Sequence, residues 1–423
     1  MATRTRVISQ NKAVYVSPTG WDIYAGHNAG TTVTGRSMIT GHQLHRVDTF
    51  SFEMDLAGTR QDVREFGQLA RIGTINLEEI NPTLSFGYFL GDGENELALG
   101  FHKTATGVSD STGQMCSGQL SEHPILSERN VYLLTVEEGK DAFAMENSNE
   151  MKTEEDKHDV VGFGNCFISS YSANFAIGEI PRADIEMQAS NVVFYTGINS
   201  GLLNPSLDLA GERNFSGTTQ LPAPDTGAEV PLVLRPQDVS VSFDEAAGAV
   251  GDGVAPIGGP SFSALPIQSA SIELPLAREV IQALGNELAY AKLLEFPIDV
   301  TMNLSSLTRD FASGALEYAL TGAAENNKTD ITLNITEPGV AGHTLRYILK
   351  GAVLDNQSFS QGLDDNETVD LTFSAQIGGA DTTTQGLFFL PQENRAVPAF
   401  TPVSGQANKE DDQPIKVIGG AGA

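Results

Sequence analysis

The amino-acid sequence predicts a mainly β protein of the α+β class, with two tandem antiparallel β-sandwich or barrel units that each carry one packed helix. Three observations predict this fold class. Short segments alternate between apolar and polar residues, the pattern of half-buried strands. The 43 glycines exceed average usage, as expected for many tight turns. The chain also repeats its own pattern, and its 423 residues suit two or three domains.

Two blocks of the chain recur at one separation. Residues 14–18 match residues 232–236, so that Pro18 corresponds to Pro236. Residues 50–54 and 60–67 match residues 270–274 and 278–285, and Gly67 stands as far from Gly285 along the chain as Pro18 does from Pro236. An alternating run follows each glycine, formed by Leu84, Phe86 and Tyr88 in the first copy and by Val300, Met302 and Leu304 in the second. The shared order and separation indicate an internal duplication.

A third block closes each copy at a shorter separation. Residues 166–168 and 184–187 match residues 352–354 and 370–373, and these matches lie closer together along the chain than those of the first two blocks. The first copy therefore carries extra residues between its helix and its last strand. Insertions belong in surface loops, and the acidic segment 137–159 is the candidate for this one.

The middle block of each copy reads as strand, helix, strand. Residues 50–56 and 270–274 alternate with a period of two, which predicts antiparallel strands with one buried face. The period then becomes helical, which predicts helices that begin near Thr59 and Pro275. We expect each helix to pack on its own sandwich, through Val63, Phe66 and Ala70 or through Leu276, Val280 and Leu284. Further strands are predicted over residues 131–136, 331–335, 345–354 and 368–377.

These patterns divide the chain into four parts. Residues 1–198 are expected to form the first unit, with its insertion near 137–159. A linker rich in Pro, Gly and Ala is expected over residues 199–230. The second unit is expected over residues 231–385, and a solvated C-terminal extension over residues 386–423.

Composition excludes several classes of function. Asp and Glu number 54 against 25 Lys and Arg, so the formal net charge is −29. Such a chain lacks the basic footprint that nucleic-acid binding needs, and an anionic membrane would repel it. Cys116 and Cys166 are too few for a disulfide framework or a four-thiolate zinc site. No apolar stretch is long enough for a membrane span, and no secretory signal is recognisable, so an intracellular protein is expected.

A search for motifs of catalysis or cofactor binding predicts none, so we expect no enzyme, no catalytic residue, no cofactor and no metal. His42 and His45 are three residues apart, which favours a solvated loop over a metal pair. The acidic turns 92–96 and 364–367 offer oxygen ligands for calcium, but they also suit β-hairpins and lack EF-hand spacing. Adjacent acids such as Glu78 with Glu79 or Glu154 with Glu155 are expected by chance.

The second copy resembles the tail tube proteins of long-tailed bacteriophages. The resemblance rests on residues 274–280 (LPLAREV), 289–292 (AYAK) and 296–300 (FPIDV), and continues through 351–358 and 369–377. It implies a β-sandwich with a flanking helix, and rings of six such units that stack into a hollow tube through which DNA passes. Two units in one chain are similar to the duplicated tube proteins of some siphophages, in which three chains make a pseudo-sixfold ring.

The resemblance implies a virion protein of the phage tail, made in the host bacterial cytoplasm. Its expected partners are further copies of itself in homotrimeric rings and other tail proteins, with no membrane partner. DNA would pass without specific binding, and the acidic composition independently suits a bore that repels phosphate. Segment 137–159 is expected on the outer wall or at the ring-to-ring contact. Alternatives are another ring-forming tail component, such as a terminator or baseplate hub, and a two-domain carbohydrate-binding or adhesion protein. Scattered aromatics, with one Trp and nine Tyr, argue against sugar binding.

Overall fold

The computed structural model describes residues 12–18, 39–40, 42–54, 60–76, 81–101, 128–135, 159–196, 202–203, 205–206, 218–221, 238–245, 267–281, 291–307, 328–336, 345–360, 368–378 and 385–391. These residues are mostly β-strand, in agreement with the predicted mainly β class. Their one α-helix, α1 (Glu94–Ala98), is a single short turn after strand β7. No helix of this described part is long and apolar enough to cross a membrane.

The first half of the chain forms a run of antiparallel strands. Neighbours in space are β4 (Val47–Glu53), β7 (Thr83–Phe89), β10 (Arg182–Gln188), β9 (Asp159–Ala176), β8 (Arg129–Thr135) and β1 (Lys12–Pro18), in that order. Strand β3 (His42–Gln43) pairs with β1, and β11 (Asn191–Thr196) pairs with the start of β9.

The second half has the same order of strands. Neighbours are β15 (Ile267–Pro275), β18 (Asp299–Leu307), β21 (Thr368–Gln376), β20 (Leu345–Ser360), β19 (Thr329–Ile335) and β14 (Val239–Glu245). Strand β22 (Gly386–Pro391) pairs with the start of β20, as β11 does with β9. Because β22 starts at Gly386, the paired strands continue into the segment that was expected to be a C-terminal extension.

The registers of the two halves also match. Asp184 faces Ser172 across β10 and β9, and Asp370 faces Ser358 across β21 and β20, so one displacement along the chain relates both partners. Both pairs then bulge at the same position: β9 has an unpaired residue, Ser169, opposite Glu186 and Met187, and β20 has an unpaired residue, Asp355, opposite Thr372 and Phe373. The long strands β9 and β20 bend at a second bulge, where the left-handed residues Asn165 (φ 49°) and Gly351 (φ 67°) stand at equivalent positions.

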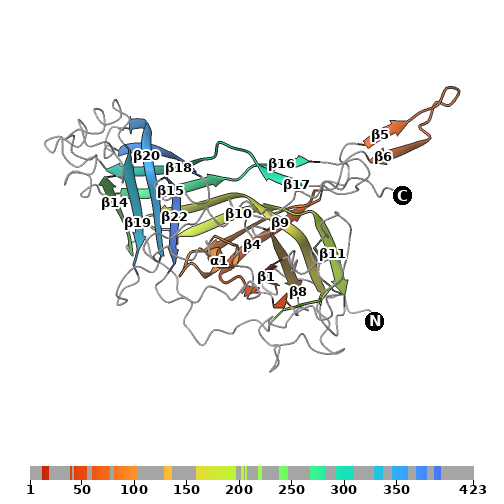
Figure 1. Ribbon diagram of the computed structural model, residues 1–423, viewed down its shortest axis with the longest axis horizontal. Coiled ribbons are helices and arrows are strands. Elements are labelled where there is room, and N and C mark those ends of the chain that lie inside the picture. Colours follow the sequence, from red (N-terminus) through yellow and green to blue (C-terminus); the bar gives the residue numbers. More distant parts are fainter. Residues whose placement is uncertain are drawn as a thin grey trace, which may run out of the picture.

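Those bends let β9 and β20 take part in two layers. One layer is a wide sheet in the order β20, β21, β18, β15, β9, β10, β7, β4, which uses the C-terminal parts of β20 and β9. The other layer consists of two small sheets, around β1, β8 and β11 and around β14, β19 and β22 (Figure 1). The core lies between the layers and includes Phe86, Ile185, Tyr171, Ile272 and Met302, each at most 2% exposed. The antiparallel pair β9 and β15 joins the two halves within the wide sheet.

Smaller sheets complete the fold. Strands β12 (Leu202–Leu203), β13 (Thr218–Gln220) and β2 (Ile39–Thr40) form a three-stranded sheet, so part of the expected linker 199–230 is paired. Two hairpins leave the wide sheet at equivalent places: β5 (Arg60–Val63) with β6 (Gly73–Asn76), and β16 (Arg278–Ile281) with β17 (Ala291–Leu294). Strands β16 and β17 each lie as far along the chain from their counterparts β5 and β6 as Gly285 lies from Gly67.

The predicted helices at Thr59 and Pro275 are therefore wrong, because the residues that follow form the two hairpins just described. Val63 ends β5, and Phe66 and Leu69 in its turn are fully exposed and touch no sandwich. Gly67 adopts φ 97° in this turn, a left-handed conformation that suits glycine. The helical spacing of Val63, Phe66 and Ala70 therefore belongs to a hairpin and its turn. Leu284, which was predicted in the second helix, lies outside the described residues.

Two details of the sequence alignment also differ from the pairing. Strand β14 pairs with β19 as β1 pairs with β8, so the counterpart of β1 starts at Val239, while residues 232–236 lie outside the described residues. Thr83 pairs with Gln188, and Thr301 pairs with Ser374. Leu84 is therefore the counterpart of Met302 and not of Val300, so the alternating runs of the two copies align two positions away from the predicted alignment. Segment 137–159 lies outside the described residues except for Asp159, the first residue of β9.

The exposed hairpin predicts an unusual tolerance of the single chain. Replacing both Phe66 and Leu69 by serine should leave the melting temperature of the unassembled chain within about 2 °C, because neither side chain is buried. Phe86→Ala is the control, and should lower stability by roughly 3–5 kcal/mol because Phe86 is 2% exposed in the core. Thermal melts of the three proteins at low concentration make the comparison. A large loss in the serine variant would show that the hairpin packs on its own chain.

Candidate assembly interface

The wide sheet has two open edges. Strand β4 pairs on one side with β7, and the C-terminal part of β20 pairs on one side with β21. Among the described residues, no strand lies on the outer side of either. Open edges offer unpaired N–H and C=O groups to another chain, so most proteins cover or close them. The two edges are therefore candidate surfaces for pairing with another chain.

Each open edge carries an exposed phenylalanine. Phe52 on β4 is 39% exposed, and Phe359 on β20 is 43% exposed. Their counterparts at the internal junction are Ile272 on β15 and Ala173 on β9, which pair directly and are fully buried. The two phenylalanines are exposed at positions whose equivalents at the internal junction are buried by the neighbouring strand.

The internal junction supplies a register for the open edges. In this junction Ser271, Ile272 and Glu273 of β15 face Asn174, Ala173 and Ser172 of β9. Strand β4 is the counterpart of β15, because a bulge directly precedes Thr49 in one strand and Ser269 in the other. Strand β20 is the counterpart of β9, with Ser358 equivalent to Ser172. The same junction between two chains would place Ser51, Phe52 and Glu53 opposite Ser360, Phe359 and Ser358.

The hairpins differ in what they contact. The base of β16–β17 docks on the first half of the chain, where Lys292 Nζ donates hydrogen bonds to Asn81 Oδ1 (3.3 Å) and to the carbonyl of Ala189 (3.4 Å). The Arg278 guanidinium lies 4.4 Å from the centre of the Phe167 ring. The equivalent hairpin β5–β6 projects away from the sheets (Figure 1). Its apolar side chains are exposed, and we call this hairpin the arm: Val63, Phe66, Leu69, Ile72 and Ile75.

Two cationic side chains of the docked hairpin act electrostatically on Glu128. Burial raises the pKa of Glu128 to about 7, although a hydrogen bond from Asn165 and the charges of Arg278, Lys292 and Arg129 oppose the shift. Burial likewise lowers the pKa of Arg278 to about 10. The charges of Arg278 and Lys292 on the hairpin therefore stabilise the ionised form of Glu128 in the first half of the chain. The arm has no such contact within its own chain among the described residues.

The outer face of the wide sheet is polar and acidic. Its strands carry the carboxylates Asp48, Glu53, Asp184, Glu186, Glu273, Asp299, Asp355 and Asp370. Among the described strands of this sheet, counting only the C-terminal part of β20, Arg182 is the one Lys or Arg. Its charge is neutralised by Asp48 (2.7 Å) and Asp184 (2.9 Å). Apolar side chains of the same strands point to the other face, into the core.

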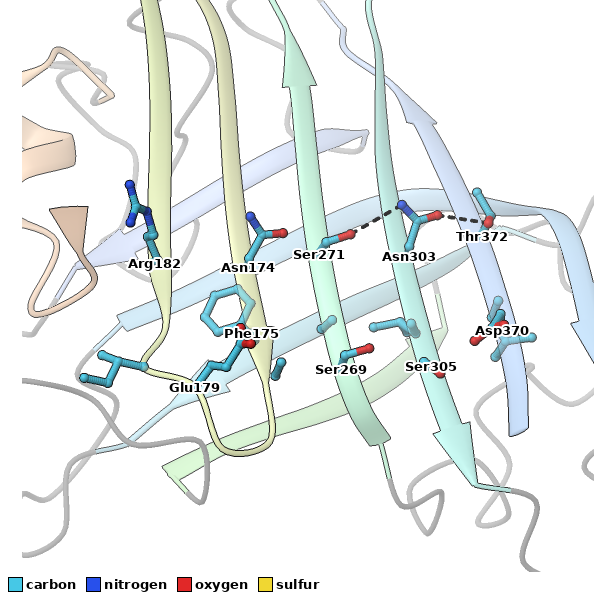
Figure 2. Close-up of a pocket in the computed structure, with 15 residues that line it drawn as sticks. Asn174, Phe175, Glu179, Arg182, Ser269, Ser271, Asn303, Ser305, Asp370 and Thr372 are labelled. Carbon is cyan, nitrogen blue, oxygen red and sulfur yellow. Dashed lines mark hydrogen bonds between the residues drawn. The ribbon is translucent and has the colours of Figure 1, made fainter. Parts of the chain in front are cut away.

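The middle of this face is hollowed and hydrogen-bonded across strands. Figure 2 shows Ser271, Asn303 and Thr372 side by side on β15, β18 and β21. Asn303 Nδ2 donates to Ser271 Oγ (3.4 Å), and Thr372 Oγ1 donates to Asn303 Oδ1 (2.9 Å). Asp370 and Glu179 also line the hollow, with Arg182 at its side. The hollow is open, and the described residues that line it form no cluster of titratable groups suited to catalysis.

The candidate metal ligands of the sequence lie in different surroundings. In turn 92–96, Asp92 pairs with Arg46 (3.3 Å), and Glu96 is a buried residue of α1 that accepts a hydrogen bond from Tyr88 Oη (2.9 Å), so both carboxylates are engaged within the chain. Several of these candidates lie outside the described residues: turn 364–367, Cys116, Glu78, Glu79, Glu154 and Glu155. Cys166 is a buried free thiol. His42 and His45 are brought together with Glu94, a neighbour that sequence spacing does not reveal.

No protein-family model matches the chain, and no curated protein matches it. Among solved structures, the chain is similar to one described as "Virion of native gene transfer agent (GTA) particle", with 10% sequence identity and a TM-score of 0.21. The match covers 36% of this chain and 95% of the other. A TM-score this low assigns neither a fold nor a function.

Proposed function

We propose that the chain is a structural virion protein that assembles into rings, and that these rings stack into the tail tube of a phage. Each ring consists of three chains with two units each, in a pseudo-sixfold arrangement. The chain is made in the host cytoplasm, contacts its own copies and other tail proteins, and performs no catalysis. This proposal agrees with the resemblance of residues 274–300 to tail tube proteins.

The internal junction between β9 and β15 carries the proposal. It joins two units of the same topology through strands whose counterparts, β20 and β4, are the two open edges of the chain. A surface and its complement on the same molecule produce a ring when the rotation closes. Repeating the internal junction between chains would pair both edges and would bury Phe52 against Phe359, which are exposed in the single chain. The arm of each chain would then dock on its neighbour as β16–β17 docks within the chain.

The dimensions suit a conduit. Three wide sheets closed edge to edge would form a barrel with a backbone diameter of about 45–50 Å, at about 4.8 Å per strand and a tilt of about 35–45°. That bore is wider than a DNA duplex even after side chains fill part of it. The acidic face of the wide sheet would line the bore, because the apolar face is already covered by the small sheets. DNA would then pass without specific binding.

Cysteine cross-linking tests the pairing and the number of chains together. In a Cys116→Ser background, Glu53→Cys combined with Ser358→Cys places two thiols opposite each other. Directly paired residues on antiparallel strands lie about 4.5–5.5 Å apart at Cα, within disulfide range. Glu53→Cys combined with Ser360→Cys is the matched control, because a shift of two positions moves the thiols about 7–8 Å apart. Oxidised samples are compared on a denaturing gel.

The expected product is a covalent series that ends at three chains, formed by the first pair and not by the control. Equal cross-linking of both pairs would reject the register, and a series that ends at six chains would reject the trimeric ring. Electron microscopy of the same sample separates the alternatives. Stacked tubes support a tube subunit, single rings support a terminator or hub, and dispersed monomers support a binding protein.

A further inference from the structure

Three side chains that could bind a metal lie together where β3 leads into β4 and β7 leads into α1. His42 belongs to β3, His45 follows that strand, and Glu94 is the first residue of α1. One ligand atom of each lies within 4.8 Å of the others, and all three residues are half-buried. Two imidazoles and a carboxylate are the donor set of many zinc sites with three protein ligands.

The backbone around the group is held in place by buried polar contacts. Asn95 is 1% exposed, and its amide clamps His45: Nδ2 donates to the His45 carbonyl (2.7 Å), while Oδ1 accepts the His45 N–H (2.9 Å). On the other side, Asp92 Oδ1 accepts the Glu94 N–H (3.3 Å) and a hydrogen bond from Arg46 (3.3 Å). These contacts fix the strand that carries both histidines against the turn that carries Glu94.

Two of the donor atoms, His42 Nε2 and Glu94 Oε1, lie at a separation that suits one shared ion. His42 Nε2 is buried and makes no hydrogen bond, although it lies 3.5 Å from Glu94 Oε1. Two donors bound to one tetrahedral zinc at about 2.0–2.1 Å stand about 3.3 Å apart. A separation of 3.5 Å is too long for a good hydrogen bond and close to that value.

We propose that His42 Nε2, a ring nitrogen of His45 and the Glu94 carboxylate bind one divalent transition-metal ion of the zinc class, with water in the fourth position. Imidazole donors favour zinc and related ions over magnesium and calcium, which prefer oxygen. The ion fastens β3, at the edge of a small sheet, to the turn after β7. Its role is structural, and all three ligands belong to one chain.

The test measures metal binding and stability of the full chain. After treatment with a chelator, the protein is titrated with Zn²⁺, Mg²⁺ and Ca²⁺ by calorimetry, and its melting temperature is recorded with each ion. Co²⁺ serves as a spectroscopic probe, because tetrahedral cobalt absorbs strongly in the visible range. His42→Gln, His45→Gln and Glu94→Gln remove the ligands one at a time. Glu53→Gln is the control for an exposed acid, and His343→Gln is the control for a histidine outside the described residues.

We expect one Zn²⁺ per chain, a higher melting temperature with Zn²⁺ alone, and an intense visible band with Co²⁺. Each histidine variant should weaken binding at least tenfold and lose the band, and Glu94→Gln should weaken it less. Both controls should bind as the original protein does. Zn²⁺ binding that is unchanged in His42→Gln, or an equal response to Mg²⁺, would overturn the proposal. So would the absence of stoichiometric binding to a protein that remains folded by circular dichroism.

Discussion

Replacing Phe359 by aspartate should abolish ring assembly while the chain stays folded. In the single chain Phe359 is 43% exposed at the outer edge of β20, so a polar side chain is tolerated there. In the ring it would lie opposite Phe52 on the core face, as Ala173 lies opposite Ile272 at the internal junction. An aspartate in that place would be desolvated without a partner. The expected loss is roughly 2–4 kcal/mol per junction, about 30- to 1000-fold in association.

Sedimentation and electron microscopy of the purified protein measure this effect. Phe194→Asp is the matched control, because Phe194 is 59% exposed on β11, which does not belong to the wide sheet. The control should still form rings and tubes, and both variants should melt like the original chain when unassembled. Assembly of Phe359→Asp at the normal concentration would show that β20 is not a subunit interface. Removing the apolar side chains of the arm should weaken assembly as well, since Phe66 and Leu69 are fully exposed in the single chain.

Much of the strand pattern could be predicted from local sequence. Alternation with a period of two predicted β19, β21 and the first part of β20, because one face of each strand is buried and the other is less covered. The sequence also predicted how the closing blocks correspond. Paired residues of β9 and β10 are related to those of β20 and β21 by the same separation along the chain as the closing blocks. Those strands lie within one sheet, where a slip by a single position would turn every apolar side chain outward.

The sequence analysis failed where side chains have no partner within the chain. Val63, Phe66 and Ala70 have helical spacing, but they face solvent in the arm, so their apolar character does not report on the fold of one chain. The helix prediction required a core for these apolar side chains, and none of them is buried in the single chain. The group of His42, His45 and Glu94 was missed for another reason. Glu94 reaches the histidines only because Asn95 and Asp92 hold the turn after β7 against β3, a long-range contact without a sequence signature.

The second large effect should come from reversing charge on the acidic face. Glu186, Glu273 and Asp370 are exposed on three different strands of the wide sheet. Replacing all three by lysine should convert an assembled tube from a surface that repels duplex DNA into one that binds it. Each lysine that neutralises a phosphate releases a counterion, so binding should weaken steeply as salt increases. The original tube should show no such binding, because its face carries many carboxylates and the compensated cation Arg182.

A matched triple variant separates position from net charge. Asp159, Glu279 and Glu295 are exposed acids outside the face of the wide sheet, and their replacement by lysine changes the net charge equally. That control should neither bind DNA as tightly nor slow its passage, because charges act over only about 8–10 Å at moderate salt. Fluorescence titrations against duplex DNA at several salt concentrations measure binding, and release of labelled DNA from particles measures passage. Tight, salt-sensitive binding by the original tube would contradict an acidic bore. Equal binding by the two lysine variants would show that total charge matters and that the polar face of the wide sheet does not line the path of the DNA.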